Sequence, residues 1–183
     1  AEEEVWDLIR FGNLNTIAPL FDKTDTDLLN VVDQGGNTPL HISAAWGYND
    51  ICRFLIRKGA RVAAINSRGF TPLHWAAMNG HDSICAMLIE ANAPIIREDM
   101  RKQTPLHLAC ANGHIGVVNL LVRNGASLQA ADEKRRTPLD LVPPRKKDMF
   151  QATVDGKLRK YLAQQQQRID LLEQKLREKG IEG

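Results

Sequence analysis

One four-residue motif returns along this chain at a fixed interval, and this repetition constrains the fold more than any other feature. Thr-Pro-Leu-His occurs at 38–41, 71–74 and 104–107, and Thr-Pro-Leu-Asp follows at 137–140, so consecutive copies lie 33 residues apart. A period of this length is typical of stacked repeats, in which each unit buries its apolar face against its neighbours. The sequence therefore predicts a repeat array.

The residues around the motif keep the same register. One column is polar, one is glycine, and four are apolar at helical spacing. Their members are Asp33, Asn66, Asp99 and Asp132; Gly47, Gly80 and Gly113; Ile51, Ile84 and Val117; Cys52, Cys85 and Val118; Leu55, Leu88 and Leu121; and Ile56, Ile89 and Val122. The motif Thr can cap a helix, and Pro fits its first turn. We expect helix pairs at 38–46 with 49–57, 71–79 with 82–90, and 104–112 with 115–123.

The motif residues resemble the ankyrin-repeat family. The resemblance rests on Thr-Pro-Leu-His, on Gly-His at 80–81 and 113–114 and on Gly-Ala at 59–60 and 125–126, and it covers about residues 5–142. It implies an all-α, elongated ankyrin-repeat solenoid of helix-turn-helix-hairpin units.

Two departures from the family pattern concern glycine. Asn92 replaces the glycine of the Gly-Ala pair, and Asn tolerates the left-handed conformation of a helix end. The hairpin glycine, present at Gly36 and Gly69, is absent at Lys102 and Arg135.

The predicted organisation has three parts. An ankyrin-repeat domain covers 1–142, a basic linker covers 143–154, and a helical, coiled-coil-like segment covers 155–183. The first part divides into an N-terminal cap unit at 1–33, full repeats at 34–66, 67–99 and 100–132, and a partial repeat at 133–142. The cap has two extra residues, which we place within 24–27, and Pro143-Pro144 stops the partial repeat.

Composition excludes other classes of protein. With 43% hydrophobic and 25% charged residues the bulk of the chain is expected to be ordered, and no apolar run approaches the roughly 20 residues of a membrane span. The acidic start, Glu2-Glu3-Glu4, does not match a secretory signal, and the missing initial Met indicates a processed product or a part of something longer. Three Cys, an odd number, favour a reduced cytoplasmic (intracellular) protein.

The sequence predicts no catalytic residue, metal site or cofactor. Although His41, His74 and His107 align in a stack, equivalent residues of adjacent repeats lie about 10 Å apart, whereas zinc needs nitrogens at about 2 Å. We expect these rings to bond the turn backbone of the neighbouring unit. Neither Cys-x-x-Cys, a phosphate-binding glycine loop nor His-Glu-x-x-His occurs, so a non-enzymatic protein is expected.

The resemblance implies a partner surface made of hairpin tips and the exposed face of the first helices. Trp46, Phe70 and Met78 are large apolar groups that the pattern predicts to be exposed in adjacent repeats, where they could form one binding patch or cover neighbouring repeats. Trp75 is expected to pack between units. The tips become more basic toward the C-terminus, through Arg68, then Arg101 and Lys102, then Lys134, Arg135 and Arg136.

We interpret the chain as a protein–protein interaction module, a scaffold or adaptor that binds a protein or peptide, with an acidic partner favoured. Two alternatives stay open. In the first, the chain binds an anionic phospholipid surface, since residues 134–168 carry ten bases and three acids. Nucleic acid is disfavoured as a partner of this stretch, because it has almost no aromatic residues for base stacking. The chain could also be the substrate-recruiting part of a larger enzyme. The sequence does not identify the partner.

The last segment carries a coiled-coil pattern. Its seam consists of Leu158, Leu162, the polar Gln165, Ile169, Leu172 and Leu176, with Leu162, Ile169 and Leu176 spaced by seven. A helix of this length with one apolar stripe is marginal alone, so it needs a partner surface, either a second chain or its own last repeat.

We predict a weak parallel homodimer through Leu162, Ile169, Leu172 and Leu176, because the seven-residue spacing favours self-pairing while Gln165 lowers its stability. Sedimentation equilibrium of the whole chain and of a version ending at Lys157 measures this. The whole chain should self-associate at high micromolar concentration, and the shorter chain should not. Equal monomeric behaviour would mean that the segment packs on the last repeat or acts as a linker.

Overall fold

The protein forms two compact units, Ala1–Pro143 and Pro144–Gly183. The computed structural model describes residues 2–23, 28–148, 150–152, 156, 167, 171, 174 and 175. The first unit carries the repeats, and the second begins with a short 3₁₀ helix, η2 (Pro144–Lys146). The two extra residues placed at 24–27 lie outside the described residues, as do the proposed dimer contacts Leu162, Ile169, Leu172 and Leu176.

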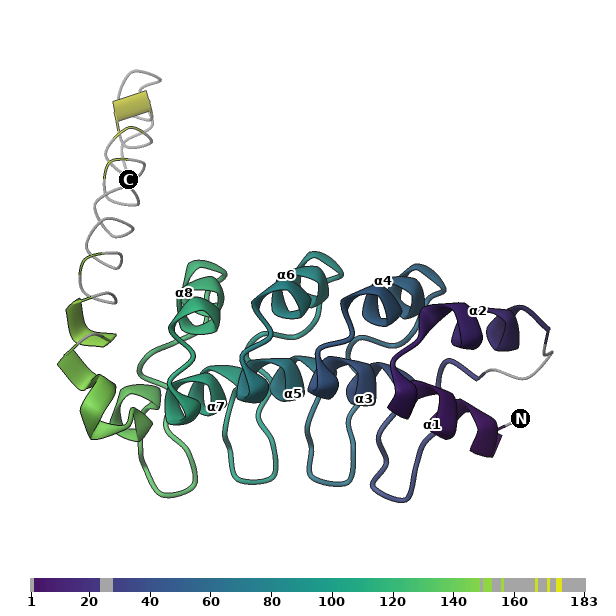
Figure 1. The fold of residues 1–183 in the computed structure, drawn as a ribbon. Coiled ribbons are helices and arrows are strands. Elements are labelled where there is room, and N and C mark those ends of the chain that lie inside the picture. Colours follow the sequence, from purple (N-terminus) through teal and green to yellow (C-terminus); the bar gives the residue numbers. More distant parts are fainter. Residues whose placement is uncertain are drawn as a thin grey trace. The chain divides into compact units, whose positions relative to one another are not determined.

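Pairs of helices follow one another along the first unit (Figure 1). The pairs are α1 (Glu2–Phe11) with α2 (Leu14–Lys23), α3 (Pro39–Trp46) with α4 (Asn49–Arg57), α5 (Pro72–Asn79) with α6 (Asp82–Glu90), and α7 (Pro105–Asn112) with α8 (Ile115–Arg123). The helix pairs expected from the 33-residue period are confirmed. The described residues contain no strand, and the prediction of an all-α ankyrin solenoid is confirmed.

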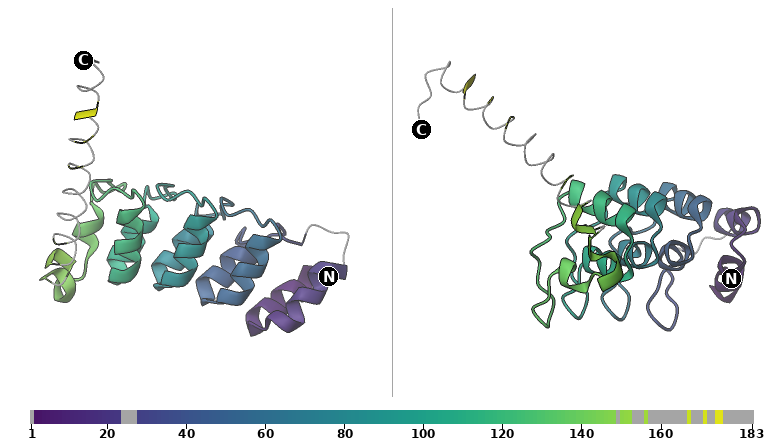
Figure 2. Two further views of the ribbon diagram at one scale, coloured as in Figure 1. Left: turned by 90° about the horizontal axis from the view of Figure 1, so that it is seen from above. Right: turned by 60° about the vertical axis from the view of Figure 1, so that its left-hand side comes forward.

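The helices of the first unit form two rows. We call α1, α3, α5 and α7 the inner helices, because the hairpins leave from their side, and α2, α4, α6 and α8 the outer helices (Figures 1 and 2). Neighbours within each row pack together, as do the two helices of each pair. Small buried residues such as Ala44, Ala76 and Ala109 let the inner helices approach closely, while Ile51 and Leu55 of α4 fill the space between the rows.

A histidine ring ties each full repeat to the hairpin of the next. The Nδ1 atom of His41 accepts the backbone N–H of Thr38 at 3.0 Å, so the ring proton lies on Nε2, which donates to the Phe70 carbonyl oxygen at 2.9 Å. The same pair of bonds joins His74 to Thr71 and Gln103, and His107 to Thr104 and Arg136. The expected role of these histidines is confirmed.

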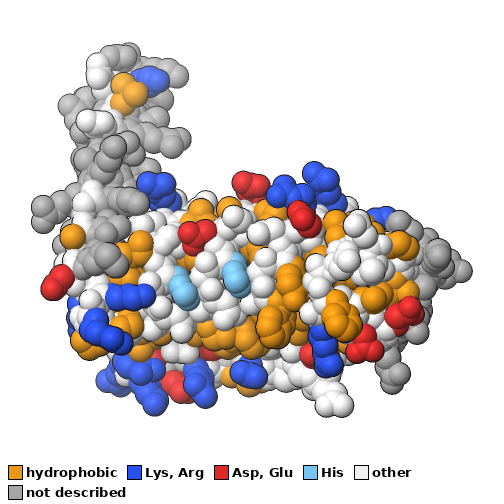
Figure 3. Space-filling model, in the orientation of Figure 1, with side chains coloured by type: hydrophobic (Ala, Val, Ile, Leu, Met, Phe, Trp, Pro, Cys, Tyr) orange, Lys and Arg blue, Asp and Glu red, His pale blue; other side chains and the backbone are white. Residues whose placement is uncertain are grey.

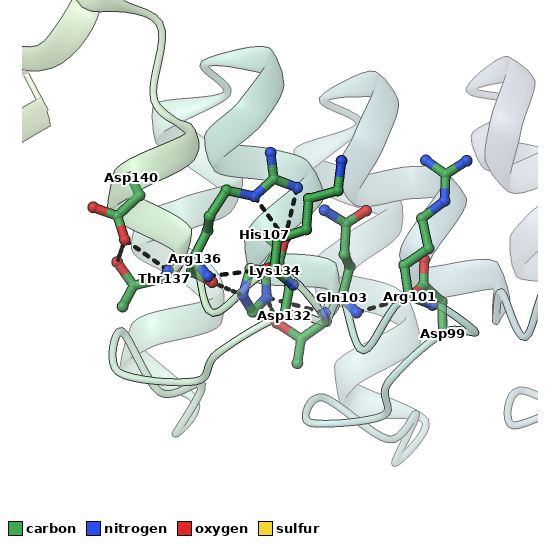
Figure 4. Close-up of polar contacts among 10 residues, drawn as sticks. Asp99, Arg101, Gln103, His107, Asp132, Lys134, Arg136, Thr137 and Asp140 are labelled. Atoms are coloured by element: carbon green, nitrogen blue, oxygen red, sulfur yellow. Dashed lines mark hydrogen bonds and ion pairs between the residues drawn. The ribbon is translucent and has the colours of Figure 1, made fainter.

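The partial repeat ends this series. The Thr137 backbone N–H and hydroxyl both donate to Asp140 Oδ2 at 2.8 Å, which reproduces the cap made by Nδ1 in the earlier repeats (Figure 4). A carboxylate is too short to bridge onward as the ring does, and the sequence holds no further Thr-Pro-Leu motif after 137–140. The 3₁₀ helix η1 (Pro138–Leu141) then stops before Pro143, since the residue preceding a proline favours extended backbone.

A second column of rings forms hydrogen bonds with carbonyl groups at the ends of the inner helices. Tyr48 donates from its hydroxyl to the Arg10 carbonyl at 3.1 Å, and the Nε2 atoms of His81 and His114 bond the carbonyls of Ala45 and Met78 at 3.1 and 3.0 Å. Gly47 must be glycine for two reasons. Its φ is 81°, and a Cβ there would lie 2.6 Å from the His81 ring.

The lowered pKa values of two bridging histidines, His41 and His74, lead us to expect a loss of stability in weak acid. Burial lowers the pKa of His74 from 6.5 to about 4, because the charged ring would lose its contact with water. A proton on Nδ1 would in addition face the Thr71 N–H. The unfolded chain therefore binds more protons between these values, and the free energy of unfolding should fall by up to about 3 kcal/mol as the pH drops from 6.5 to 4. Urea unfolding at pH 7, 6 and 5 measures this, and a flat profile would contradict it.

Candidate protein-interaction surface

Each hairpin tip is organised by one side chain of the polar column. Asp99 Oδ1 accepts the backbone N–H groups of Arg101 and Gln103, both at 2.8 Å. Equivalent bonds run from Gly35 and Asn37 to Asp33, from Arg68 and Phe70 to Asn66, and from Lys134 and Arg136 to Asp132. The tips therefore share one loop conformation, which places equivalent residues in equivalent positions.

Neighbouring tips are also joined through their backbones. The Ser67 N–H donates to the Gly35 carbonyl at 2.9 Å, and the Met100 N–H donates to the Arg68 carbonyl at 3.1 Å. The Glu133 N–H continues the series to the Arg101 carbonyl at 2.9 Å. The hairpins consequently form an ordered row in which tip side chains are repeated at the spacing of the stack.

Three cations occupy the same position on successive tips. Arg68, Arg101 and Lys134 are spaced by 33 residues and are all exposed. In Figure 4 the side chains of Arg101 and Lys134 extend toward the same side of the hairpins. Figure 3 shows Lys and Arg side chains gathered along the lower edge of the stack, where Figure 1 places the hairpins. We call Arg68, Arg101 and Lys134 the basic ladder.

Arg136, another predicted contact, is engaged within its own hairpin. Its Nη2 and Nε atoms donate to Asp132 Oδ2 at 2.7 and 3.0 Å (Figure 4). Burial alone would raise the pKa of Asp132, but hydrogen bonds from Arg136 and from the backbone N–H groups of Arg136 and Lys134 lower it to about 2. Arg136 thus stiffens the last tip beside the basic ladder.

Two further tip cations stand where a glycine would be easier to accommodate. Lys102 and Arg135 have φ values of 57° and 60°, at the position that Gly36 and Gly69 occupy with 74° and 79°. A left-handed residue with a side chain costs about 1–2 kcal/mol. Such strain is found most often at functional sites, and here both strained residues carry a positive charge at a hairpin tip.

The predicted apolar patch is only partly correct. Trp46 is 65% exposed as expected and Met78 is half-buried, but the expectation that Phe70 is exposed is wrong, since its exposed fraction is 8%. The Phe70 ring stacks on His74 and meets Trp75 edge-on, with ring centroids 5.3 Å apart in both pairs. Phe70 therefore belongs to the packing between a hairpin and its inner helix.

Trp75 packs between units, as predicted. Its Nε1 atom donates to Asn37 Oδ1 at 3.3 Å in the preceding hairpin, and the Arg68 guanidinium lies 5.7 Å from the centroid of its ring. This cation–π contact positions the first member of the basic ladder.

A hollow of about 350 Å³ lies between two hairpins and the inner helices α5 and α7. Its lining combines apolar groups with two cations of the ladder: Arg68, Phe70, Met78, Asp99, Met100, Arg101, Gln103 and Leu108. Met100 is 74% exposed at the hairpin tip. Sequence reasoning missed Met100 and Leu108, although Met100 is the one apolar member of a tip column that otherwise holds Gln34, Ser67 and Glu133.

Phe11 was also missed. It is 81% exposed and precedes the helix-ending Gly12 as Trp46 precedes Gly47. Since α1 packs against α3, two exposed aromatic groups stand at equivalent ends of neighbouring inner helices. The spacing of 35 residues hid this match, whereas the shared aromatic-glycine pair would have revealed it.

The cysteines and the possible metal ligands of the described residues can be located directly. Cys52, Cys85 and Cys110 are free and buried, and burial raises the pKa of each thiol to about 12. Among the described residues there is no group of three or more His, Cys, Asp or Glu that could hold a metal ion. Over the same residues, no helix combines the length and apolar character needed to cross a membrane.

Comparison with protein families agrees with the geometry. A family of ankyrin repeats (3 copies) matches residues 6–99, and a family of ankyrin repeats (many copies) matches residues 88–142. The chain belongs to the ankyrin-repeat family. Ankyrin repeats are generic protein–protein interaction modules, and ankyrin-repeat proteins are typically non-enzymatic.

Among curated proteins, the chain is similar to the human transient receptor potential cation channel subfamily A member 1. The two are 43% identical over 51 residues, which make up 27% of this chain and 5% of the channel. The similarity thus spans a small fraction of the length of that relative.

Proposed function

We propose that this chain is a scaffold or adaptor whose ankyrin stack binds a protein or peptide across the hairpin tips and inner helices. The observation that carries the proposal is the hollow between hairpins and inner helices, where exposed Met100 lies beside Arg68 and Arg101. Apolar anchors within a polar rim are the usual arrangement of a binding surface. The hydrogen-bonded row of tips supports the proposal, because a surface that is already ordered loses little entropy on binding.

The surface offers two kinds of contact. Trp46 and Phe11 present aromatic rings at the ends of inner helices, and exposed aromatic side chains are frequent energetic anchors. Met78, in the lining of the hollow, adds a further apolar contact. The predicted cationic contacts Arg68, Arg101, Lys102, Lys134 and Arg136 supply charge at the tips, while Phe70 acts as a buried support for the hollow.

The rest of the chain extends this proposal. Residues 155–183 would bring two copies together or connect the stack to other segments, as their heptad spacing suggests. The three buried, free thiols are in keeping with an intracellular location, which we propose on that ground and on the odd number of Cys.

Truncation of the exposed tryptophan tests the proposed surface. Proteins retained from a lysate of the source organism by the immobilised wild-type chain would be identified, purified and measured for affinity. Trp46→Ala should weaken binding of a genuine partner by about 2 kcal/mol or more while helical content stays unchanged, because the ring is exposed at the partner surface.

Ile65→Ala is the matched control. Ile65 is exposed but lines a separate hollow of about 740 Å³ with Val32 and Arg97. The Ile65→Ala variant should bind the partner with the same affinity as the wild-type chain. If Ile65→Ala weakens binding and Trp46→Ala does not, the partner uses the other hollow, and the proposed surface is wrong.

A further inference from the structure

The basic ladder has a spacing that a peptide can match. Equivalent atoms of stacked repeats are offset by about the distance between packed helices, roughly 8–10 Å. Arg68, Arg101 and Lys134 are held at this repeat by the backbone bonds between neighbouring tips. Their side chains are exposed, so three cationic side chains start from backbone positions that repeat at nearly this interval.

An extended chain presents a side chain on one face at the same interval. Three residues of polyproline II backbone rise about 9.3 Å and complete one turn, so residues i, i+3 and i+6 point the same way. Acidic residues at these positions would meet the three members of the basic ladder in order.

The hollow adds a requirement for an apolar side chain. It opens between Arg68 and Arg101, the first two members of the ladder, and Met78, Met100 and Leu108 contribute its apolar lining. A volume of about 350 Å³ is at the lower end of the range for ligand pockets. One leucine, methionine or phenylalanine located between the first two acidic residues would therefore enter it.

We propose that this surface recognises an extended acidic peptide segment with acidic residues three apart and one apolar residue between the first two. The inference rests on the proposed function and specifies its partner. The acidic residues bind the basic ladder, and the apolar side chain fills the hollow.

The concave lining favours a peptide over a phospholipid surface. A layer of anionic headgroups would satisfy Arg68, Arg101 and Lys134 but would leave the apolar lining of the hollow uncovered. The strained cations Lys102 and Arg135 add positive potential near the ladder and would accelerate association with an acidic segment.

Short labelled peptides test the spacing. The first set carries Glu at positions 1, 4 and 7 and Leu at position 2 or 3, with Ser elsewhere. A second set has the same composition with the three Glu at positions 1, 2 and 3, and a third has Ser in place of Leu. By fluorescence anisotropy, the first set should bind the full chain at least about fivefold more tightly than either control set, and more weakly as NaCl is raised.

Variants of the full chain locate the contact. Arg101→Ser should weaken binding of the first set about tenfold or more, while Arg123→Ser, the same change at the exposed end of α8, should alter it less than about twofold. Met100→Ser should remove the advantage of Leu over Ser. Lys102→Gly removes a positive charge, so it should weaken binding. It also removes the strain of a left-handed residue with a side chain, so the unfolding midpoint should not fall.

Each contrary result overturns the inference. Equal binding of spaced and clustered acidic residues, or no binding of the first set at millimolar concentration, rejects the recognition pattern. A second result would also reject the peptide: the chain binds phosphatidylserine vesicles and not the peptides, and Arg101→Ser abolishes the vesicle binding. The basic ladder would then be a contact for an anionic membrane. If a partner depends on Trp46 but is unaffected by Arg101→Ser, the proposed function holds and only the acidic peptide is wrong.

Discussion

The stack depends on one imidazole ring bonded at both of its nitrogens. In each full repeat Nδ1 accepts the N–H of the capping threonine, and this fixes the proton on Nε2, which bonds the hairpin carbonyl of the next repeat. One residue therefore starts a helix and joins two units. Because the ring is buried, both bonds are needed to offset its desolvation. At 137–140 an Asp replaces the ring: Asp140 accepts the N–H of the capping threonine, and the series of histidine bridges ends at His107.

The interaction surface follows from this repetition. The three histidines attach the hairpins at 66–70, 99–103 and 132–136 in the same way. The polar column gives each tip the same loop, and backbone bonds join neighbouring tips. Residues 33 apart in sequence thus become neighbours in space, and three cations of one column become a row. The tip side chains differ from repeat to repeat. The hydrogen bonds that shape each tip use only the backbone N–H groups of Arg68, Arg101 and Lys134, so their side chains are not needed for the loop conformation.

The repeat fold could be predicted from sequence because its causes are local and recur. Residue type and period predict where the first helix of a repeat begins and ends, at Thr38 and Gly47. They also predict the bond between His41 and the neighbouring repeat. The surface was harder to predict, because exposure depends on packing between repeats. Phe70 occupies a tip column yet turns inward onto His74 and Trp75, whereas Met100, in the column three positions earlier, stays exposed. Phe11 was missed because the cap unit departs from the period.

The claim that the tips and inner helices form the recognition surface can be tested residue by residue. Amide and methyl NMR spectra of the labelled chain would be recorded during titration with the peptide that carries Glu at positions 1, 4 and 7. We expect chemical-shift changes confined to the tips at 67–70, 100–103 and 133–136 and to the methyl groups of Met78, Met100 and Leu108. Shifts on the outer helices α4, α6 and α8, with unchanged tips, would contradict it.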